Sequence, residues 1–78
     1  MAKSVIVYST PSCPWCIRLK QFLKENNVLF SDRDVAADKP AADEMVKKSG
    51  QMGVPVLDIE GEIIVGFDKD KIKQLLGL

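Results

Sequence analysis

Thr10-Pro11-Ser12-Cys13-Pro14-Trp15-Cys16 is the stretch that decides the fold, because it sets two thiols three positions apart between an apolar run and an amphipathic one. Pro14 has no amide hydrogen and fits the first turn of a helix, so the sequence predicts a helix that begins at Cys13 or Pro14. Free amide hydrogens and the helix dipole then favour a thiolate at Cys13, the expected attacking thiol. Cys16 lies just under a turn deeper, so we expect it to be more buried and still close enough for a disulfide.

Two other uses of this cysteine pair are disfavoured. A disulfide that closes so short a loop would constrain little of the unfolded chain. Zinc normally takes four protein ligands in a structural site, and the chain has two cysteines and no histidine. Only a metal or an iron–sulfur cluster shared between two chains would fit that count. The pair therefore indicates redox chemistry, with Cys13 and Cys16 as the candidate catalytic residues and no metal ligands.

Length and composition indicate one globular domain, residues 1–78. The chain is 46% hydrophobic and 28% charged, which is an ordinary balance for a protein that folds alone. Eleven basic and eleven acidic residues leave no positive excess, which argues against a nucleic-acid partner. No apolar run approaches 18 residues and no leader pattern is present, so we expect neither a membrane span nor export. Cytoplasmic localisation is expected, where a Cys-x-x-Cys pair has catalytic or electron-carrying meaning.

The other elements follow from apolar spacing and from capping residues. In chain order, the sequence predicts a buried strand over residues 3–8, a helix over 14–26, an exposed edge strand over 29–34, a helix capped by Asp38 and ended by Ser49-Gly50, a hairpin of residues 54–59 and 62–65 around Glu60-Gly61, and a last helix opened by Asp68 or Asp70. The expected inward-facing residues are Cys16, Leu19, Phe22, Leu23, Met45, Val46, Ile72, Leu75 and Leu76. Met52 is expected to fill a gap in the core as Met45 does, and Lys69, Lys71 and Lys73 to form a solvated face.

This order of elements predicts an α/β fold. A strand–helix–strand opening requires a right-handed crossover and parallel pairing, and the closing hairpin adds antiparallel neighbours. The expected architecture is a four-stranded mixed sheet flanked by three helices, in the order β-α-β-α-β-β-α.

Three motifs together give the chain a resemblance to the glutaredoxins over nearly its whole length. They are Cys-Pro-Trp-Cys after the first strand, Gly50-Gln51-Met52-Gly53-Val54-Pro55 before the third, and Gly66-Phe67-Asp68 before the last helix. The resemblance implies a thioredoxin fold and thiol–disulfide exchange, with glutathione as a co-substrate rather than a bound cofactor. It also implies a cis peptide bond before Pro55. The glutathione-binding residues that it implies are Trp15, Gln51, Val54, Pro55, Phe67 and Asp68.

Physical reasons support parts of this implied site. The Val54 backbone can pair with a peptide-like ligand as an added strand would, and a helix N-terminus at Phe67-Asp68 suits the γ-glutamyl end. Trp15 is expected either as an exposed apolar platform beside the sulfur or as a half-buried residue of the helix start. Since no histidine is available, Arg18 and Lys20 are the candidate charge partners of the thiolate, with a solvated role as the alternative.

The chain departs from the usual glutaredoxin pattern at several positions. Thr10 stands where a lysine is usual, Gly53 where a threonine is usual and Met52 where arginine is frequent, so a charge or a donor for glutathione is missing at each. Gly66-Phe67 is similar to glutaredoxin-like electron donors that thioredoxin reductase reduces. The expected partners are glutathione, disulfide-containing or glutathionylated proteins and a reductase system, with the chain a monomer. An electron carrier reduced by thioredoxin reductase and a dimer that binds an iron–sulfur cluster with glutathione stay open as alternatives.

Overall fold

A mixed sheet with helices on both faces forms the frame of the molecule. The computed structural model describes residues 4–78. Its elements are β1 (Val5–Ser9), α1 (Pro14–Glu25), β2 (Ser31–Asp34), α2 (Lys39–Ser49), β3 (Val56–Ile59), β4 (Glu62–Val65) and α3 (Lys69–Leu76). This order confirms the predicted β-α-β-α-β-β-α arrangement. Of the first predicted strand, Lys3 lies outside the described residues.

The strand order in the sheet is β2-β1-β3-β4. β1 pairs in parallel with β2 and antiparallel with β3, which in turn pairs antiparallel with β4. A central position explains why the unbroken apolar run of β1 is almost entirely buried. β2 is an exposed edge strand, as its polar sequence predicted, although it begins at Ser31 rather than at Leu29.

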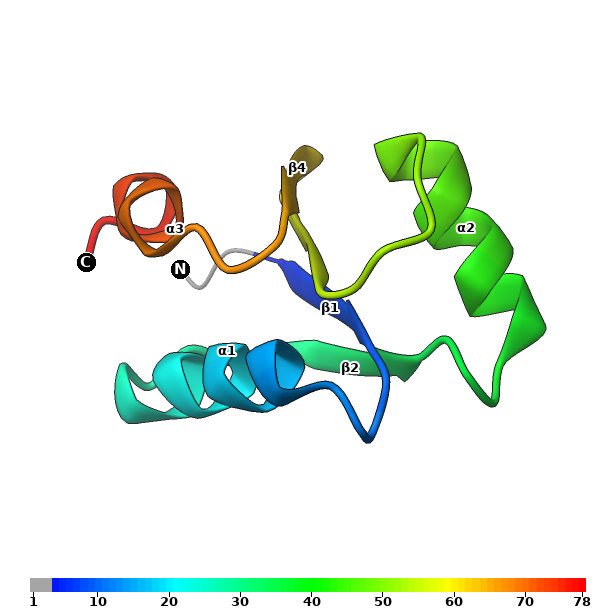
Figure 1. Ribbon diagram of the computed structural model, residues 1–78. Helices are drawn as coiled ribbons and strands as arrows, with labels where there is room; N and C mark the ends of the chain where they lie inside the picture. The colour runs from blue at the N-terminus through cyan, green and yellow to red at the C-terminus, as the bar shows by residue number, and fades with distance from the viewer. Residues whose placement is uncertain (1–3) are drawn as a thin grey trace.

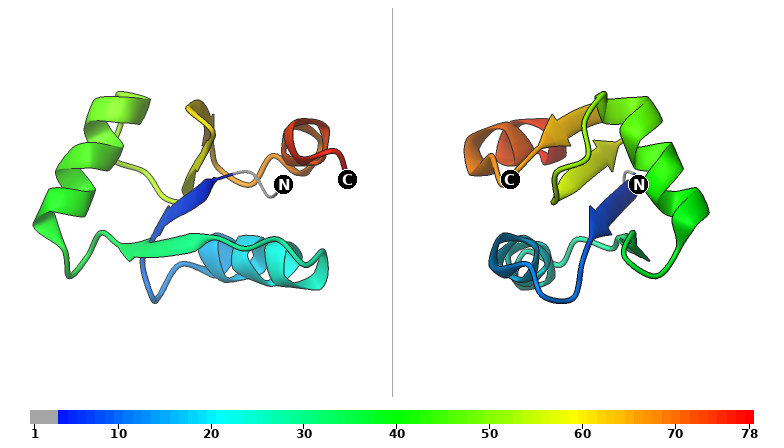
Figure 2. Two further views of the ribbon diagram at one scale, coloured as in Figure 1. Left: turned by 180° about the vertical axis from the view of Figure 1, so that it is seen from behind. Right: turned by 45° about the vertical axis from the view of Figure 1, so that its right-hand side comes forward.

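The helices form two layers, with α1 and α3 on one face of the sheet and α2 on the other, which both views of Figure 2 show (Figures 1 and 2). Alternate residues of β1 therefore face different helices. The larger core lies under α1 and α3 and contains Val5, Val7, Leu19, Phe22, Leu23, Leu57, Ile59, Ile64 and Ile72. The smaller core lies under α2 and contains Tyr8, Met45 and Val56.

Local capping rules account for the element ends. The carboxylates of Asp38 and Asp68 accept hydrogen bonds from backbone amides in the first turns of α2 and α3, so both are the predicted N-caps. The hairpin turns at Glu60-Gly61, where both residues have positive φ (54° and 92°), as a two-residue turn of type I′ requires. One prediction is wrong: Met52 is 80% exposed and fills no gap in the core, because the loop before β3 carries it outside the sheet.

An ionic network fastens α2 to its face of the sheet. The Lys48 ammonium donates to the Tyr8 hydroxyl at 2.8 Å and to the Asp58 carboxylate at 2.6 Å, and it pairs with Glu44 at 3.3 Å. Arg33 extends the network to β2 through Glu44, also at 3.3 Å. Asp58 accepts a further hydrogen bond from the Gly61 amide, so the same carboxylate ties α2 to the hairpin turn.

Candidate active site

The two cysteines occupy the N-cap and the first turn of α1. Cys13 is the N-cap, with extended backbone angles, and its sulfur accepts a hydrogen bond from the Cys16 amide at 3.3 Å. Pro14 follows at the first helical position, as predicted. Cys13 is partly exposed, Cys16 is buried, and both are free thiols. The two sulfurs therefore differ in access to solvent, although they are only three residues apart.

The environment of Cys13 favours its ionised form. Burial alone would raise the pKa of the Cys13 thiol, but hydrogen bonds from the Cys16 side chain and from the Cys16 and Trp15 amides outweigh it. The positive charge of Lys20 acts in the same direction, so the net result is a lowered pKa. A lowered pKa and partial exposure are the properties of a nucleophilic cysteine.

The environment of Cys16 has the opposite effect. Burial, followed by its hydrogen bond with Cys13, raises the pKa of the Cys16 thiol to about 11. Cys16 thus stays protonated at neutral pH while Cys13 carries the larger thiolate share. The sequence predicted this asymmetry from helix position alone, and the burial of Cys16 beside a partly exposed Cys13 agrees with it.

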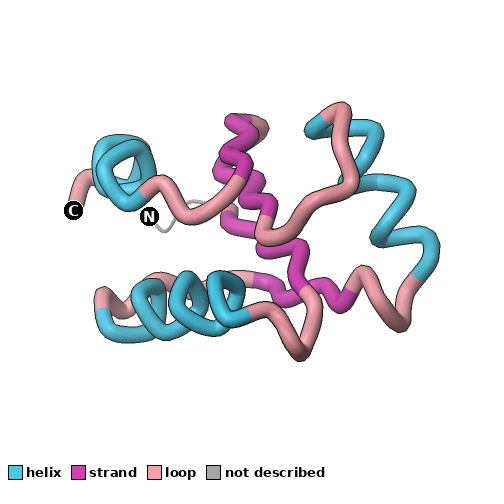
Figure 3. The backbone as a smooth tube through the Cα atoms, in the orientation of Figure 1, coloured by secondary structure: helices cyan, strands magenta, loops and turns pink. Residues whose placement is uncertain are grey.

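A pocket of about 280 Å³ opens beside the thiols, lined by Trp15, Val54, Pro55, Gly66 and Phe67. It forms where the start of α1 meets the loops before β3 and after β4, which are drawn in pink in Figure 3. The Gly66 amide donates to the Pro55 carbonyl at 2.8 Å and holds these two loops together. The peptide bond before Pro55 is cis, as the resemblance implied.

Val54 lies directly against the exposed thiol. Its carbonyl oxygen is 4.0 Å from the Cys13 sulfur, close enough to accept a weak S–H hydrogen bond. Within residues 4–78 the Val54 amide hydrogen has no hydrogen-bond acceptor. This leaves a donor available to a ligand that lies alongside the strand.

Trp15 is the most exposed aromatic side chain near the thiols. It is 56% exposed and lines the pocket, which favours the exposed platform over the half-buried alternative. The Arg18 guanidinium lies over its indole ring, 5.1 Å from the ring centroid. Of the two candidate charge partners, Lys20 therefore acts on the thiols, whereas Arg18 contacts Trp15.

Two of the implied glutathione-binding residues do not line the pocket. The Gln51 side chain is bonded to the backbone of Gly53, accepting from its amide at 2.6 Å and donating to its carbonyl at 3.1 Å. The Asp68 carboxylate accepts from the Lys71 amide at 3.2 Å as the cap of α3. Both side chains therefore have structural partners, and any contact of theirs with a ligand would come from the outer rim.

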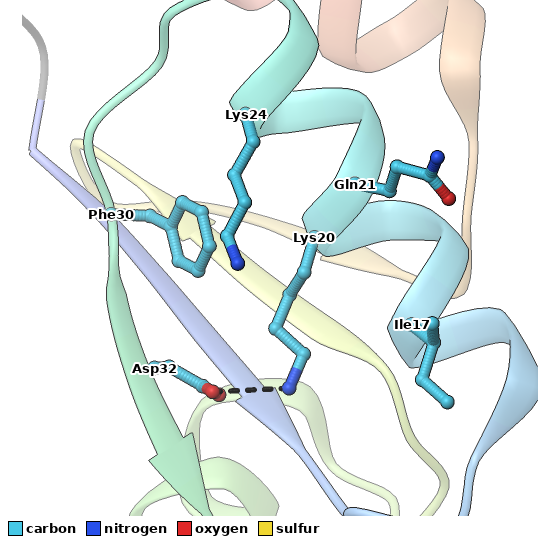
Figure 4. A pocket seen from close by; sticks show the side chains of 6 residues that line it. All are labelled: Ile17, Lys20, Gln21, Lys24, Phe30 and Asp32. Carbon is cyan, nitrogen blue, oxygen red and sulfur yellow. Dashed lines mark hydrogen bonds and ion pairs between the residues drawn. The ribbon is translucent and has the colours of Figure 1, made fainter.

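The sequence analysis missed a polar cluster that connects α1 to the two strands beside it. The Lys20 ammonium donates to the Asp32 carboxylate at 3.0 Å and to the Ser9 hydroxyl at 3.3 Å, and Ser9 donates to Asp32 at 2.8 Å. Figure 4 shows Lys20 and Lys24 reaching from α1 toward β2, where a second pocket of about 500 Å³ lies. Ser9, the polar end of an otherwise apolar strand, was the signal for this cluster.

Fold and site together define a class, namely thioredoxin-fold proteins with a cysteine pair at a helix N-terminus. The solved structure of the thioredoxin-like protein BC3987 superposes with a TM-score of 0.87 and 38% identity, covering 92% of this chain and 99% of that one. The sequence model described as Glutaredoxin matches residues 5–64. The chain belongs to the glutaredoxin family.

Individual relatives agree with this assignment. An uncharacterized glutaredoxin-like 8.6 kDa protein in the rubredoxin operon of Clostridium pasteurianum is 50% identical over 70 residues, covering 90% of this chain and 93% of the relative. Glutaredoxin 3 of Escherichia coli K12 is 32% identical over 65 residues, with coverage of 83% and 78%. Family membership supports a thiol–disulfide oxidoreductase role. No helix in the described part of the chain has the length and apolar character needed to cross a membrane.

Proposed function

We propose that the chain is a glutathione-linked thiol–disulfide oxidoreductase in which Cys13 attacks and Cys16 resolves. The observation that carries this proposal is the unequal state of the two thiols. Cys13 is partly exposed with a lowered pKa, and Cys16 is buried with a pKa raised to about 11. Thiolates attack and thiols do not, so the order of the two steps follows from this difference.

The reaction proceeds by two exchanges. The Cys13 thiolate attacks one sulfur of a substrate disulfide, forms a mixed disulfide with it, and releases the other sulfur as a thiolate that takes up a proton. Cys16 then loses its proton and attacks the Cys13 sulfur, which releases the second substrate thiolate and leaves a Cys13–Cys16 disulfide. The substrate gains two electrons and the protein loses two. Two molecules of glutathione, or a reductase, return the protein to the dithiol.

Glutathione is proposed to bind in the pocket beside Cys13. The free Val54 amide and its carbonyl would pair with the tripeptide backbone, with Pro55 below. Trp15 and Phe67 would flank it with apolar surface. The first turn of α3, at Asp68, would receive the γ-glutamyl carboxylate through its amides. Gln51 would contact the ligand from the edge of the pocket.

The proposal extends to the working form of the protein. We place it as a single domain, residues 1–78, acting as a monomer in the cytoplasm, where the glutathione pool keeps thiols reduced. Its substrates would be protein disulfides and glutathionylated proteins.

Serine variants of the two cysteines test the assignment. Cys13→Ser is expected to abolish reduction of every disulfide. Cys16→Ser is expected to keep much of its turnover of a glutathionylated peptide, because glutathione can resolve that mixed disulfide, while losing reduction of protein disulfides. Equal losses in the two variants would contradict the roles. NADPH consumption measured with glutathione and glutathione reductase, beside thioredoxin reductase, identifies the reductant.

A further inference from the structure

Two positively charged side chains lie on aromatic rings next to the pocket. Arg18 lies over the Trp15 ring, 5.1 Å from its centroid, and the Lys69 ammonium lies 5.4 Å from the centroid of Phe22. Phe22 in turn packs against Phe67, with ring centroids 5.7 Å apart. Since Trp15 and Phe67 both line the pocket, Arg18 is one ring away from it and Lys69 is two rings away. We call Arg18 and Lys69 the cationic rim.

Neither rim cation is neutralised by a carboxylate. The ion pairs among residues 4–78 are Lys20–Asp32, Arg33–Glu44, Lys48–Glu44 and Lys48–Asp58, and none includes the rim. The Asp68 carboxylate, next to Lys69 in the chain, is bonded to a backbone amide instead. A cation that stacks on a ring is held in one orientation but keeps its hydrogen-bond donors, so both rim cations can bind an anionic partner.

The pocket itself has no charged lining residue. A carboxylate that reaches Arg18 or Lys69 must therefore belong to a part of the partner that extends beyond the pocket. Met52, two residues before Val54, is an exposed apolar side chain on the loop that forms one wall of the pocket. Aromatic, methionine and arginine side chains around an uncharged centre are the composition of a protein-contact surface. A polypeptide fits this surface better than a ligand confined to the pocket.

We propose that the cationic rim selects polypeptide disulfides that carry an acidic side chain close to the reacting cysteine. The disulfide would reach Cys13 through the pocket, while the neighbouring Glu or Asp binds Arg18 or Lys69. The inference rests on the proposed function and deepens it, because it names the class of protein substrate. It adds no covalent step to the exchange.

The test compares two peptide disulfides that differ only by Glu or Gln beside the cysteine. The wild type is expected to reduce the Glu peptide with a higher kcat/KM than the Gln peptide, because its KM is lower. This preference is expected to shrink with added salt. Arg18→Gln and Lys69→Gln should each lower the ratio of kcat/KM for the Glu peptide to that for the Gln peptide by roughly 1.5- to 5-fold, the range for one exposed charge pair. Lys24→Gln on α1 and Lys73→Gln on α3 are matched controls, since they remove an exposed cation from the same helices. Both controls should keep the full preference.

Binding separates this inference from the proposed function. Peptides with serine in place of cysteine cannot react, and their affinity is measured through the fluorescence of Trp15, the only tryptophan in the chain. Tighter binding of the Glu peptide that depends on Arg18 and Lys69 supports the rim even if no disulfide is reduced. Equal affinity for the Glu and Gln peptides would overturn the rim even if both disulfides are reduced.

Glutathione provides the remaining arm of the test. The Arg18→Gln variant is expected to reduce glutathione disulfide at the wild-type kcat/KM, because Arg18 neither lines the pocket nor lies in the first turn of α3, where the γ-glutamyl carboxylate is proposed to bind. If Arg18→Gln lowered that value by the same factor as for the Glu peptide, Arg18 would serve the carboxylates of glutathione, and the inference would be wrong.

Discussion

Two lysines on opposite faces of the sheet bind the same kinds of partner, but one mainly affects stability and the other the thiols. Lys48 on α2 joins the Tyr8 hydroxyl to the Asp58 carboxylate, and Lys20 on α1 joins the Ser9 hydroxyl to the Asp32 carboxylate. The exposed fractions of the side chains are 27% and 12% for Lys48 and Asp58, but 21% and 46% for Lys20 and Asp32. Of these two lysines, Lys20 is the one whose charge favours the ionised form of both thiols.

This difference separates stability from chemistry. Around Lys48, burial would lower the lysine pKa and raise that of Asp58, but their mutual hydrogen bond reverses both directions. The pair is thus a strong link between α2 and β3. Around Lys20 the carboxylate is open to water, so this ion pair adds less to stability. The closeness of Lys20 to the two thiols at the start of α1 matters more. Similar residues at similar distances therefore serve the fold in one place and the thiols in the other.

The largest expected effect is on stability at Lys48. Lys48→Met leaves the mostly buried Asp58 carboxylate without its cation, which should lower the free energy of unfolding by about 1–3 kcal/mol. Urea denaturation at neutral pH measures this loss. The pKa of Cys13 should stay at its wild-type value in the same variant. A shift of that pKa would break the separation between the two networks.

The pH dependence of stability sharpens the same comparison. The pKa of Asp58 is lowered by Lys48, so its stabilisation is present above the ordinary carboxyl pKa of about 3.9 and is lost as pH falls through the lower folded value. The raised pKa of Lys48 keeps its contribution intact below the ordinary lysine value, so loss on that side occurs only at strongly alkaline pH. Asp58→Asn should flatten the acid limb of a stability–pH curve. An unchanged acid limb would show that other carboxylates cause the loss of stability at low pH.

The smallest effect on stability, and the clearest on the thiols, is expected at Lys20. Lys20→Met should cost about 0.2–1 kcal/mol, the range for a partly exposed ion pair. It should raise the pKa of both thiols, because a cation that favours the thiolates is removed. Asp32→Asn, which removes the opposing charge, should shift the Cys13 pKa downward. Absorbance of the thiolate at 240 nm measures both shifts, and shifts of the same sign would show that they come from disturbed structure instead.

Local rules in the sequence were enough for the frame of the site. Pro14 fixes the start of α1, and this start makes Cys13 the N-cap and buries Cys16, all of which the sequence predicted. The edge position of β2 followed in the same way from its polar residues. These features depend on neighbours within one helical turn or one strand, which the sequence displays directly.

Contacts between distant segments could not be predicted in this way. Lys48 meets Tyr8 and Asp58 only because β1 and β3 pair in one register, 40 and 10 residues away along the chain. The side chain of Gln51 was free to reach a ligand by sequence, but the shape of its loop bonds it to Gly53. Met52 was wrongly placed in the core for the same reason, since apolar character does not reveal the direction in which a loop residue points.

The central claim is that the two thiols of one motif are unequal, and alkylation as a function of pH tests it most directly. The reduced protein is treated with iodoacetamide at a series of pH values, and mass spectrometry of the peptides locates the modified cysteine. Cys13 should be alkylated first, with a midpoint below the ordinary thiol pKa of about 8.5, while Cys16 reacts only toward its pKa of about 11. Modification of Cys16 first, or a common midpoint for both cysteines, would contradict the account.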